Sequence, residues 1–296
     1  MKAVLSLHGS RGGVLAMFAM ALTVSLAPAG VAWAEGKPKN LYMVSVGITN
    51  AIGQPVLQST KKDALDVAKW AHSQKGKLFG QVHVATITNE RATGKRVLGA
   101  LSGLESKAKA GDYVIFYISS HGAKNKKGEY FFCAYDGNVL WSQITNALRK
   151  APGNKIVILD TCFAGAATSS NMVVMAACRA NQFSHDGTSA RGNSIYTQYL
   201  LEGLYGKADA NKNGIVTLAE AAAYASAKLH KIYDSKPAKD QQFSVLHRPN
   251  SISASLPLAK LRAAAGLTIF WTPWGSLALQ PESLRLDLTG GTRASF

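Results

Sequence analysis

A histidine and a cysteine each follow an apolar, β-rich run of the sequence. His121 comes just after residues 112–119 (DYVIFYIS), and Cys162 comes just after residues 155–159 (KIVIL). If the two runs are neighbouring strands of a parallel sheet, both side chains leave the sheet at the same edge, where the catalytic groups of such sheets lie. An imidazole within reach of a thiol is the arrangement of an activated cysteine nucleophile. The sequence therefore predicts His121 and Cys162 as a catalytic pair.

A reaction at such a pair needs a group that accepts the thiol proton and a site that stabilises the negative charge formed on the substrate carbonyl oxygen. A thiol with an ordinary pKa of about 8.5 is mostly protonated at neutral pH, so the imidazole must lower that pKa or take the proton during attack. Gly122 has no side chain, and we expect its backbone N–H, with that of Cys162, to form an oxyanion hole. The alternative is that His121 and Cys162 are structural residues at strand ends.

The elements that would position this pair alternate between strand-like and helix-like segments. Strands are expected over residues 41–48, 81–88, 112–119, 130–135, 155–159 and 172–177, and helices over 60–74, 93–110, 141–149, 195–204 and 218–233. In the first helix, Leu65, Ala68 and Trp70 are expected to face the core. Strands separated by helices need crossover connections, which predicts an α/β fold with a mostly parallel central sheet and helices on both faces.

The N-terminus has the pattern of a secretory signal peptide over residues 1–34. Lys2 and Arg11 precede an apolar run at residues 14–26, and Ala32-Trp33-Ala34 is a small-x-small cleavage site. The alternative is a membrane anchor, but the run is short for a spanning helix and no later segment is long and apolar enough. We expect an exported protein, periplasmic or secreted, with its main domain at residues 37–257 and an unassigned tail at residues 258–296.

Charge and cysteine content limit the remaining classes of function. The formal net charge is +16, which favours anionic surfaces, but the bases are scattered and no nucleic-acid motif is present, so we expect no nucleic-acid role. The basic loop at residues 124–127 is either an exposed loop or a site of self-cleavage. The three cysteines are too few for a disulfide framework. Cys133 and Cys178 lie in apolar runs and are interpreted as buried thiols, or as a single bridge.

Longer motifs around the two reactive residues carry a family resemblance. Residues 119–122 (SSHG) and 160–165 (DTCFAG), with the His and Cys 41 positions apart (162 − 121), resemble the caspase and metacaspase clan, especially bacterial caspase-like peptidases. Residues 62–64 (KDA), 176–182 (AACRANQ) and 194–204 fit the same resemblance, which covers about residues 40–257. It implies a caspase–haemoglobinase fold and endopeptidase activity through a thioester. The segment after Cys162 is short, which favours a single-chain enzyme.

The resemblance also bears on specificity. Asp160 stands where animal caspases have a glutamine, and similarity to metacaspases implies that Asp63, Ser119 and Asp160 line the pocket for the side chain before the scissile bond. A carboxylate in such a pocket would select Arg or Lys. The alternatives are that Asp160 caps a helix or turn and that Asp63 is an ordinary acid in the first turn of a helix. The chain departs from the common Ser-Gly-His-Gly form of the first motif at Ser120, which could crowd His121. Residues 185 and 186 (His-Asp) are interpreted as part of a solvated loop, with contact to substrate as the alternative.

Residues 209–220 have the spacing of a calcium-binding loop. The expected ligands are Asp209, Asn211, Asn213, the Ile215 carbonyl and Glu220, with a glycine at the sixth position. The alternative is a polar turn leading into a capping box formed by Thr217 and Glu220. We expect no cofactor to be required for the chemistry, and calcium is the one candidate ion.

Together these observations predict an exported caspase-like cysteine endopeptidase that cuts after Arg or Lys. Its partners would be protein or peptide substrates with basic residues, and we expect a monomer without a membrane span. The alternative is a catalytically weak caspase-like scaffold that binds peptides and has a calcium-stabilised loop. Rapid alkylation of Cys162 would distinguish the enzyme from the scaffold.

Overall fold

The computed structural model describes residues 39–187, 192–262, 267–271 and 277–281. The predicted signal peptide and most of the tail beyond residue 262 lie outside these described residues. Among the helices that the structure does describe, none is long and apolar enough to cross a bilayer.

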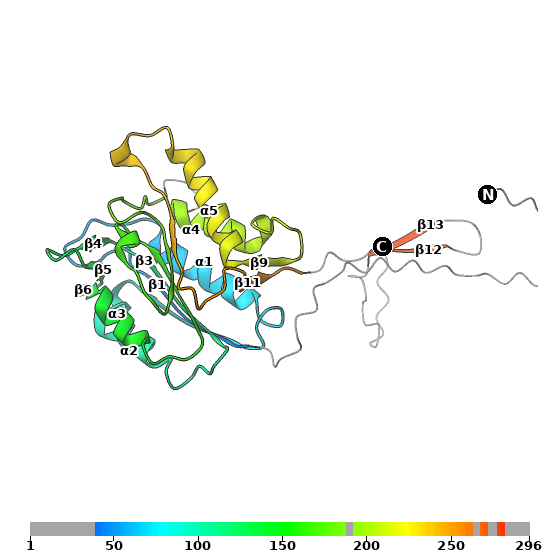
Figure 1. Ribbon diagram of the computed structural model, residues 1–296, viewed down its shortest axis with the longest axis horizontal. Coiled ribbons are helices and arrows are strands. Elements are labelled where there is room, and N and C mark those ends of the chain that lie inside the picture. Colours follow the sequence, from blue (N-terminus) through cyan, green and yellow to red (C-terminus); the bar gives the residue numbers. More distant parts are fainter. Residues whose placement is uncertain (1–38, 188–191, 263–266, 272–276, 282–296) are drawn as a thin grey trace, which may run out of the picture. The chain divides into compact units, whose positions relative to one another are not determined.

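A six-stranded sheet forms the centre of the domain, in the order β10-β8-β7-β3-β1-β2. Figure 1 labels two of its strands, β1 and β3. All neighbouring strands are parallel except β10, which pairs antiparallel with β8 at the edge. The strands are β1 (Leu41–Gly47), β2 (Val82–Thr88), β3 (Tyr113–Ser119), β7 (Asn154–Asp160), β8 (Val173–Ala176) and β10 (Val245–His247). The predicted mostly parallel sheet is confirmed.

Helices cover both faces of this sheet, as Figure 1 shows. The reason is visible in β3, where alternate side chains point to opposite faces. Tyr113, Ile115 and Tyr117 join one apolar core, whereas the residues between them join the other. The first core includes residues of α1 (Thr60–Ser73), α4 (Ile195–Glu202) and α5 (Leu218–Tyr233), and the second includes residues of α2 (Gly94–Ser102) and α3 (Trp141–Leu148).

Two details of the predicted helices are wrong. Leu65 of α1 is 48% exposed, because the buried face of that helix runs through Ala64, Val67 and Ala71 at helical spacing, and Leu65 lies beside that face. The helix expected over residues 93–110 ends at Ser102, where Gly103 is its C-cap, and turns replace the rest.

Smaller elements complete the described chain. Beyond the end of β3, a three-stranded antiparallel sheet is formed by β4 (Gly122–Lys124), β5 (Tyr130–Ala134) and β6 (Gly137–Leu140). β9 (Ile215–Thr217) pairs with β11 (Pro257–Lys260), and β12 (Leu267–Trp271) pairs with β13 (Leu277–Pro281). The short helices are η1 (Asn89–Arg91), η2 (Ala164–Ala166), η3 (Gly203–Lys207) and η4 (Ala238–Asp240).

The pairing of β3 with β7 sets the position of the reactive residues. Every aligned pair in this parallel ladder is 41 positions apart in the chain, ending with Ser119 opposite Asp160 (160 − 119). His121 and Cys162 are also 41 positions apart, and each lies two residues beyond the last aligned pair. The register therefore carries both residues past the same edge of the sheet.

Candidate active site

His121 and Cys162 line one pocket at the carboxyl edge of the sheet. This narrow pocket has a volume of about 30 Å³, and its other lining residues are Leu57, Ser59, Thr60, Ser119, Ser120, Asp160, Thr161, Ser184, His185, Asp186 and Ser194. The structure thus brings together the imidazole, the thiol and two of the three residues expected to bind substrate. The third, Asp63, is completely buried behind Ser119 and does not line the pocket.

The absence of a side chain at Gly122 lets the residues that follow β3 pack directly against the residues that follow β7. A Cβ atom added at Gly122 would lie 2.7 Å from both the Cys162 carbonyl oxygen and the Thr161 Oγ1, too close for any real side chain. The neighbouring His121 carbonyl accepts from the Cys133 N–H of β5 at 2.9 Å. In an antiparallel ladder the next N–H then points away from the partner strand, so the Gly122 N–H is directed away from β5. This direction is compatible with the predicted oxyanion hole, in which the Gly122 N–H would donate to a bound ligand.

One contact defines the tautomer of His121. Its Nε2 lies 2.7 Å from the Pro55 carbonyl oxygen. A carbonyl oxygen can only accept a hydrogen bond, so Nε2 carries the proton in the neutral ring and Nδ1 has the free lone pair. Pro55 therefore orients the imidazole. The sequence carried no signal for it, because Pro55 lies 66 positions away in the chain.

Cys162 is half-buried, and its thiol lies 3.7 Å from the Ser184 carbonyl oxygen, to which it donates. Burial raises the pKa of this thiol above its ordinary value. Of the two roles predicted for the imidazole, the structure favours proton transfer during attack over a thiolate formed in advance.

The Asp160 carboxylate is buried but fully supplied with donors. One oxygen accepts from the Thr197 Oγ1 at 2.6 Å, from the Thr197 N–H at 3.2 Å and from the Ser194 hydroxyl. The other oxygen accepts from the Ser184 Oγ at 2.7 Å. These donors come from the N-terminus of α4 and from the loop after β8. The carboxylate therefore links three segments of the chain at the floor of the pocket.

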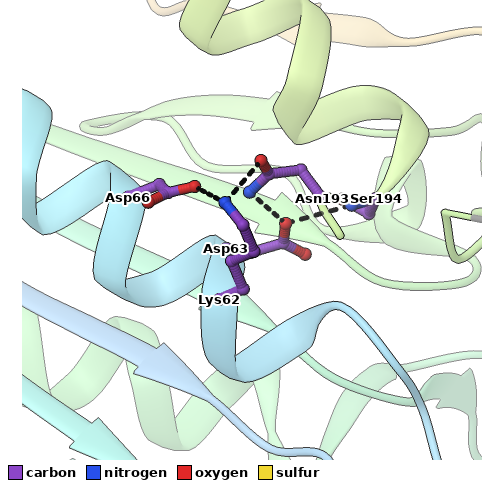
Figure 2. Close-up of polar contacts among 5 residues, drawn as sticks. All are labelled: Lys62, Asp63, Asp66, Asn193 and Ser194. Carbon is purple, nitrogen blue, oxygen red and sulfur yellow. Dashed lines mark hydrogen bonds and ion pairs between the residues drawn. The ribbon is translucent and has the colours of Figure 1, made fainter. Parts of the chain in front are cut away.

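Asp63 lies in the first turn of α1, in the layer behind that floor. One carboxylate oxygen accepts from the Asn193 Nδ2 and from the Ser194 N–H, each at 3.0 Å, as Figure 2 shows. The other accepts from the Ser119 Oγ at 2.9 Å. Lys62 approaches Asp63 only indirectly, because its ammonium donates to the Asn193 Oδ1 at 3.3 Å and pairs with Asp66 (Figure 2).

The two carboxylates influence each other's ionisation. Burial, followed by the charge of Asp160, raises the pKa of Asp63 to about 7. Burial also raises the pKa of Asp160. Among the ion pairs of the described residues, none neutralises either acid. A pair of buried carboxylates without a cation is an environment that favours binding a positive charge.

The loop after β8 forms one wall of the pocket. Gln242, which is completely buried, accepts from the His185 N–H at 2.9 Å and donates to the Ser184 Oγ at 3.2 Å. The Asp186 carboxylate accepts from the Ser59 N–H at 3.1 Å at the start of α1. His185 and Asp186 are partly exposed and both line the pocket, which favours the alternative that they contact a substrate.

Two other expectations have definite outcomes. Cys133 and Cys178 are buried free thiols, so the bridge considered between them is absent. The Ser120 hydroxyl, which replaces the usual glycine, donates to the Cys133 carbonyl at 2.6 Å and is thereby held by β5.

In the predicted calcium loop, the acidic side chains accept hydrogen bonds from the backbone of the loop itself. The Asp209 carboxylate accepts from the N–H groups of Asn213 and Gly214 at 3.1 and 2.9 Å. Glu220 accepts from the Thr217 N–H and hydroxyl, which is the capping box that the sequence offered as an alternative. No cluster of three or more His, Cys, Asp or Glu side chains suited to a metal occurs in the described part of the chain.

Comparisons with known proteins agree with this architecture. Residues 46–246 match the family model of the caspase domain, peptidase C14. A protein of solved structure from Geobacter sulfurreducens is 16% identical over 76% of this chain and all of that chain, with a TM-score of 0.57. Caspase-1 from Spodoptera frugiperda is 12% identical over 76% of this chain and 90% of its own, with a TM-score of 0.52. The curated proteins give no significant match.

The raised pKa of Asp63 predicts a pH-dependent stability cost. An aspartate in the unfolded chain ionises with a pKa of about 3.9, whereas Asp63 in the folded protein ionises with a pKa of about 7. The free energy of unfolding therefore falls as the pH rises from about 3.9 through about 7. Asp63→Asn removes this cost. Its Oδ1 can accept the bonds from Asn193 and Ser194, and its Nδ2 can donate to the Ser119 Oγ, which reverses the direction of the third bond. We expect the melting temperature of this variant to exceed that of the wild type by a smaller margin at pH 5 than at pH 8, where the difference should be roughly 3–10 °C.

Asp66→Asn is the matched control, because Asp66 is a partly exposed acid less than one turn further along the same helix. Thermal unfolding between pH 5 and 8 measures both variants. A constant difference between wild type and Asp63→Asn at every pH would contradict the raised pKa.

Proposed function

We propose, from the premise that this chain belongs to the caspase domain family, that it is a cysteine endopeptidase that cuts after Arg or Lys. The observation that carries the proposal is the shared pocket of His121 and Cys162 at two register-matched strand ends, with a buried acid pair beside them. Family membership supports a peptidase reaction on protein substrates. The roles of Cys162 as nucleophile and of His121 as proton acceptor and donor, and the specificity for Arg or Lys, are our own inference.

The first half of the reaction forms an acyl-enzyme. The Cys162 Sγ attacks the carbonyl carbon of the scissile bond while its proton passes to His121 Nδ1, the ring nitrogen with the free lone pair. The carbonyl oxygen becomes an oxyanion, which the backbone N–H groups of Gly122 and Cys162 would stabilise. The C–N bond then breaks, the nitrogen takes the proton from Nδ1, and a thioester remains on Cys162.

The second half releases the acid product. Nδ1 removes a proton from water, and the resulting hydroxide adds to the thioester carbonyl. The intermediate collapses by expelling the Cys162 sulfur, which regains its proton from the imidazolium. Throughout both halves, the Pro55 carbonyl would hold Nε2–H and stabilise the charged imidazolium ring.

The acid pair supports selection of a basic side chain. Two carboxylates within one hydrogen-bond network, unpaired by any cation of the described residues, would gain from a guanidinium or ammonium group beside them. An acidic side chain would be repelled by the negative charge of the two carboxylates. Because the pocket has a volume of only about 30 Å³, a basic side chain would need the loops that line it to move apart.

The test is hydrolysis of fluorogenic peptides that differ only in having Arg, Lys or Asp before the scissile bond. We expect kcat/KM for Arg and Lys to exceed that for Asp by at least about 100-fold, since an unpaired buried charge is costly. KM for the Arg peptide should fall as pH rises from 6 to 8, because ionisation of Asp63 adds negative charge behind the pocket that Asp160 lines. Cys162→Ala and His121→Ala should each lose about 1,000-fold or more.

Cys133→Ala is the matched control, since Cys133 is a buried free thiol outside the pocket. Turnover only after Asp would contradict the specificity. The alternative, a peptide-binding scaffold of weak activity, predicts no turnover and no selective alkylation of Cys162 by iodoacetamide over the other two thiols.

Export is a second part of the proposal, supported by the charged start, the apolar run and the Ala-Trp-Ala site of residues 1–34. We expect the protein recovered from the periplasm or medium of an expressing bacterium to begin near Glu35. N-terminal sequencing measures this, and a substitution of Ala34 by a bulky residue should block the processing. Recovery of an uncleaved chain from the cytoplasm would contradict export.

Calcium binding at residues 209–220 is a separate proposal. It is supported by the left-handed backbone at Lys212 and Gly214, the strand that starts at Ile215 and the helix that follows. Glu220 would exchange its capping role for the ion. We expect millimolar calcium, but not magnesium, to raise the melting temperature by about 2–6 °C at saturation, and Asp209→Ala to abolish the rise. An equal shift in wild type and variant would contradict the proposal.

A further inference from the structure

The hydroxyl of Tyr117 belongs to the polar network of Asp63 and Asp160 but has no part in the proposed reaction. Tyr117 lies in β3, two residues before Ser119, and its side chain is completely buried. Its hydroxyl oxygen lies 2.6 Å from the Thr197 Oγ1, which is 80 positions away in the chain. Thr197 lies in the first turn of α4, so this hydrogen bond joins the central sheet to the start of that helix.

The direction of this bond follows from the protons available. The Thr197 Oγ1 donates to the Asp160 carboxylate at 2.6 Å. A hydroxyl group has only one proton to donate, so the Thr197 oxygen must accept from Tyr117. Two hydrogen bonds in series therefore run from the Tyr117 O–H to Thr197 and from the Thr197 O–H to Asp160.

Tyr117 is a donor that keeps its proton. Burial, followed by the charges of Asp63 and Asp160, raises the pKa of Tyr117 well above its ordinary value. Hydrogen bonds in series polarise one another, so the bond from Tyr117 strengthens the bond that Thr197 gives to the carboxylate. A stronger bond to the ionised carboxylate favours that form over the protonated one.

The charge of Asp160 depends on such donors. Among the ion pairs of the described residues, none includes Asp160. On the open side, His121, His185 and Asp186 line the same pocket. On the buried side, the titratable groups are acids, phenols or thiols. Burial, together with the charge of Asp160, raises the pKa of each of them: Asp63 of α1, Tyr117 of β3, Tyr196 of α4, Tyr233 of α5, Cys162 and Cys178.

We propose that Tyr117 is a positioning residue for substrate specificity, which acts through Thr197 to keep Asp160 in the ionised form that binds a basic side chain. The proposal rests on the proposed function, in which Asp160 lines the pocket for the substrate residue before the scissile bond. Tyr117 does not line that pocket. It therefore influences the binding of the basic side chain and leaves the chemical step at Cys162 unchanged.

The test measures KM and kcat for the Arg peptide in Tyr117→Phe at pH 6 and pH 8. Without the phenol hydroxyl, the bond from Thr197 weakens and Asp160 ionises less readily. We expect KM to rise by about 5-fold at pH 6, the effect of one hydrogen bond. At pH 8 Asp160 is ionised in both proteins, so the rise should be less than about 2-fold. kcat should be unchanged at both pH values.

Thr197 allows a rescue experiment. Thr197→Ser keeps a hydroxyl between Tyr117 and Asp160, so its KM should equal that of the wild type at both pH values. Thr197→Val has a similar volume but no hydroxyl, and its KM at pH 6 should rise at least as much as that of Tyr117→Phe.

Tyr196→Phe is the matched control. Tyr196 is a buried tyrosine of α4 whose pKa is raised by burial and by the charge of Asp160, with no hydrogen bond contributing to that shift. Removal of its hydroxyl should leave KM at the wild-type value at both pH values.

Two results overturn the role of Tyr117 while the proposed function stands. One is an unchanged KM in Tyr117→Phe, or a rise of equal size at pH 6 and pH 8. The other is a KM in Thr197→Ser that rises as much as in Thr197→Val. If the wild type cleaves no Arg peptide at all, the proposed function fails and this inference fails with it.

Discussion

The contact between two strand ends is the constraint on which the candidate site depends. β3 and β7 pair in parallel with an offset of 41 positions, so the residues that follow them are delivered side by side. At that point the backbone of Cys162 comes so close to Gly122 that no Cβ fits between them. A shift of register by one residue would turn these side chains to the opposite face of the sheet. The chemistry proposed for this chain therefore begins with the hydrogen-bond ladder of the central sheet.

The second constraint is a pair of buried carboxylates, which is energetically unfavourable in the free protein. Asp63 and Asp160 are buried close enough to raise the pKa of Asp63, and no Lys or Arg of the described residues neutralises them. Serine, threonine and asparagine donors compensate part of the cost of burial. Such a site costs stability in the free protein, and a cationic ligand would recover that cost on binding. Functional sites commonly carry this kind of local instability.

The loop after β8 connects these two features. It places the Ser184 carbonyl near the thiol and the Ser184 hydroxyl on Asp160, and Gln242 fixes both His185 and Ser184 from a completely buried position. The same loop carries Phe183, which is 50% exposed and contacts Phe163 edge to face. A single segment thus contributes both to the pocket and to the surroundings of Cys162, so movement of this loop would change both together.

The amino-acid sequence alone predicted the class of fold, and it predicted that His121 and Cys162 lie at the same edge of the sheet. Apolar runs of strand length, separated by amphipathic segments, leave a parallel sheet with covered faces as the arrangement that buries them. His121 and Cys162 could be found because each directly follows such a run, and local pattern is visible in a single sequence. The same local pattern misplaced Leu65, since which face of a helix is buried depends on what packs against it.

Only the tertiary structure decided the contacts that turn those residues into a site. Pro55 orients His121 across 66 positions, Gln242 holds His185 across 57, and Asp186 reaches the residues before α1 across 127 or more. Contacts over such distances leave no spacing pattern, because they arise from the way the loops pack after the sheet has formed. The burial that places Asp63 behind the pocket, and raises its pKa, has the same origin.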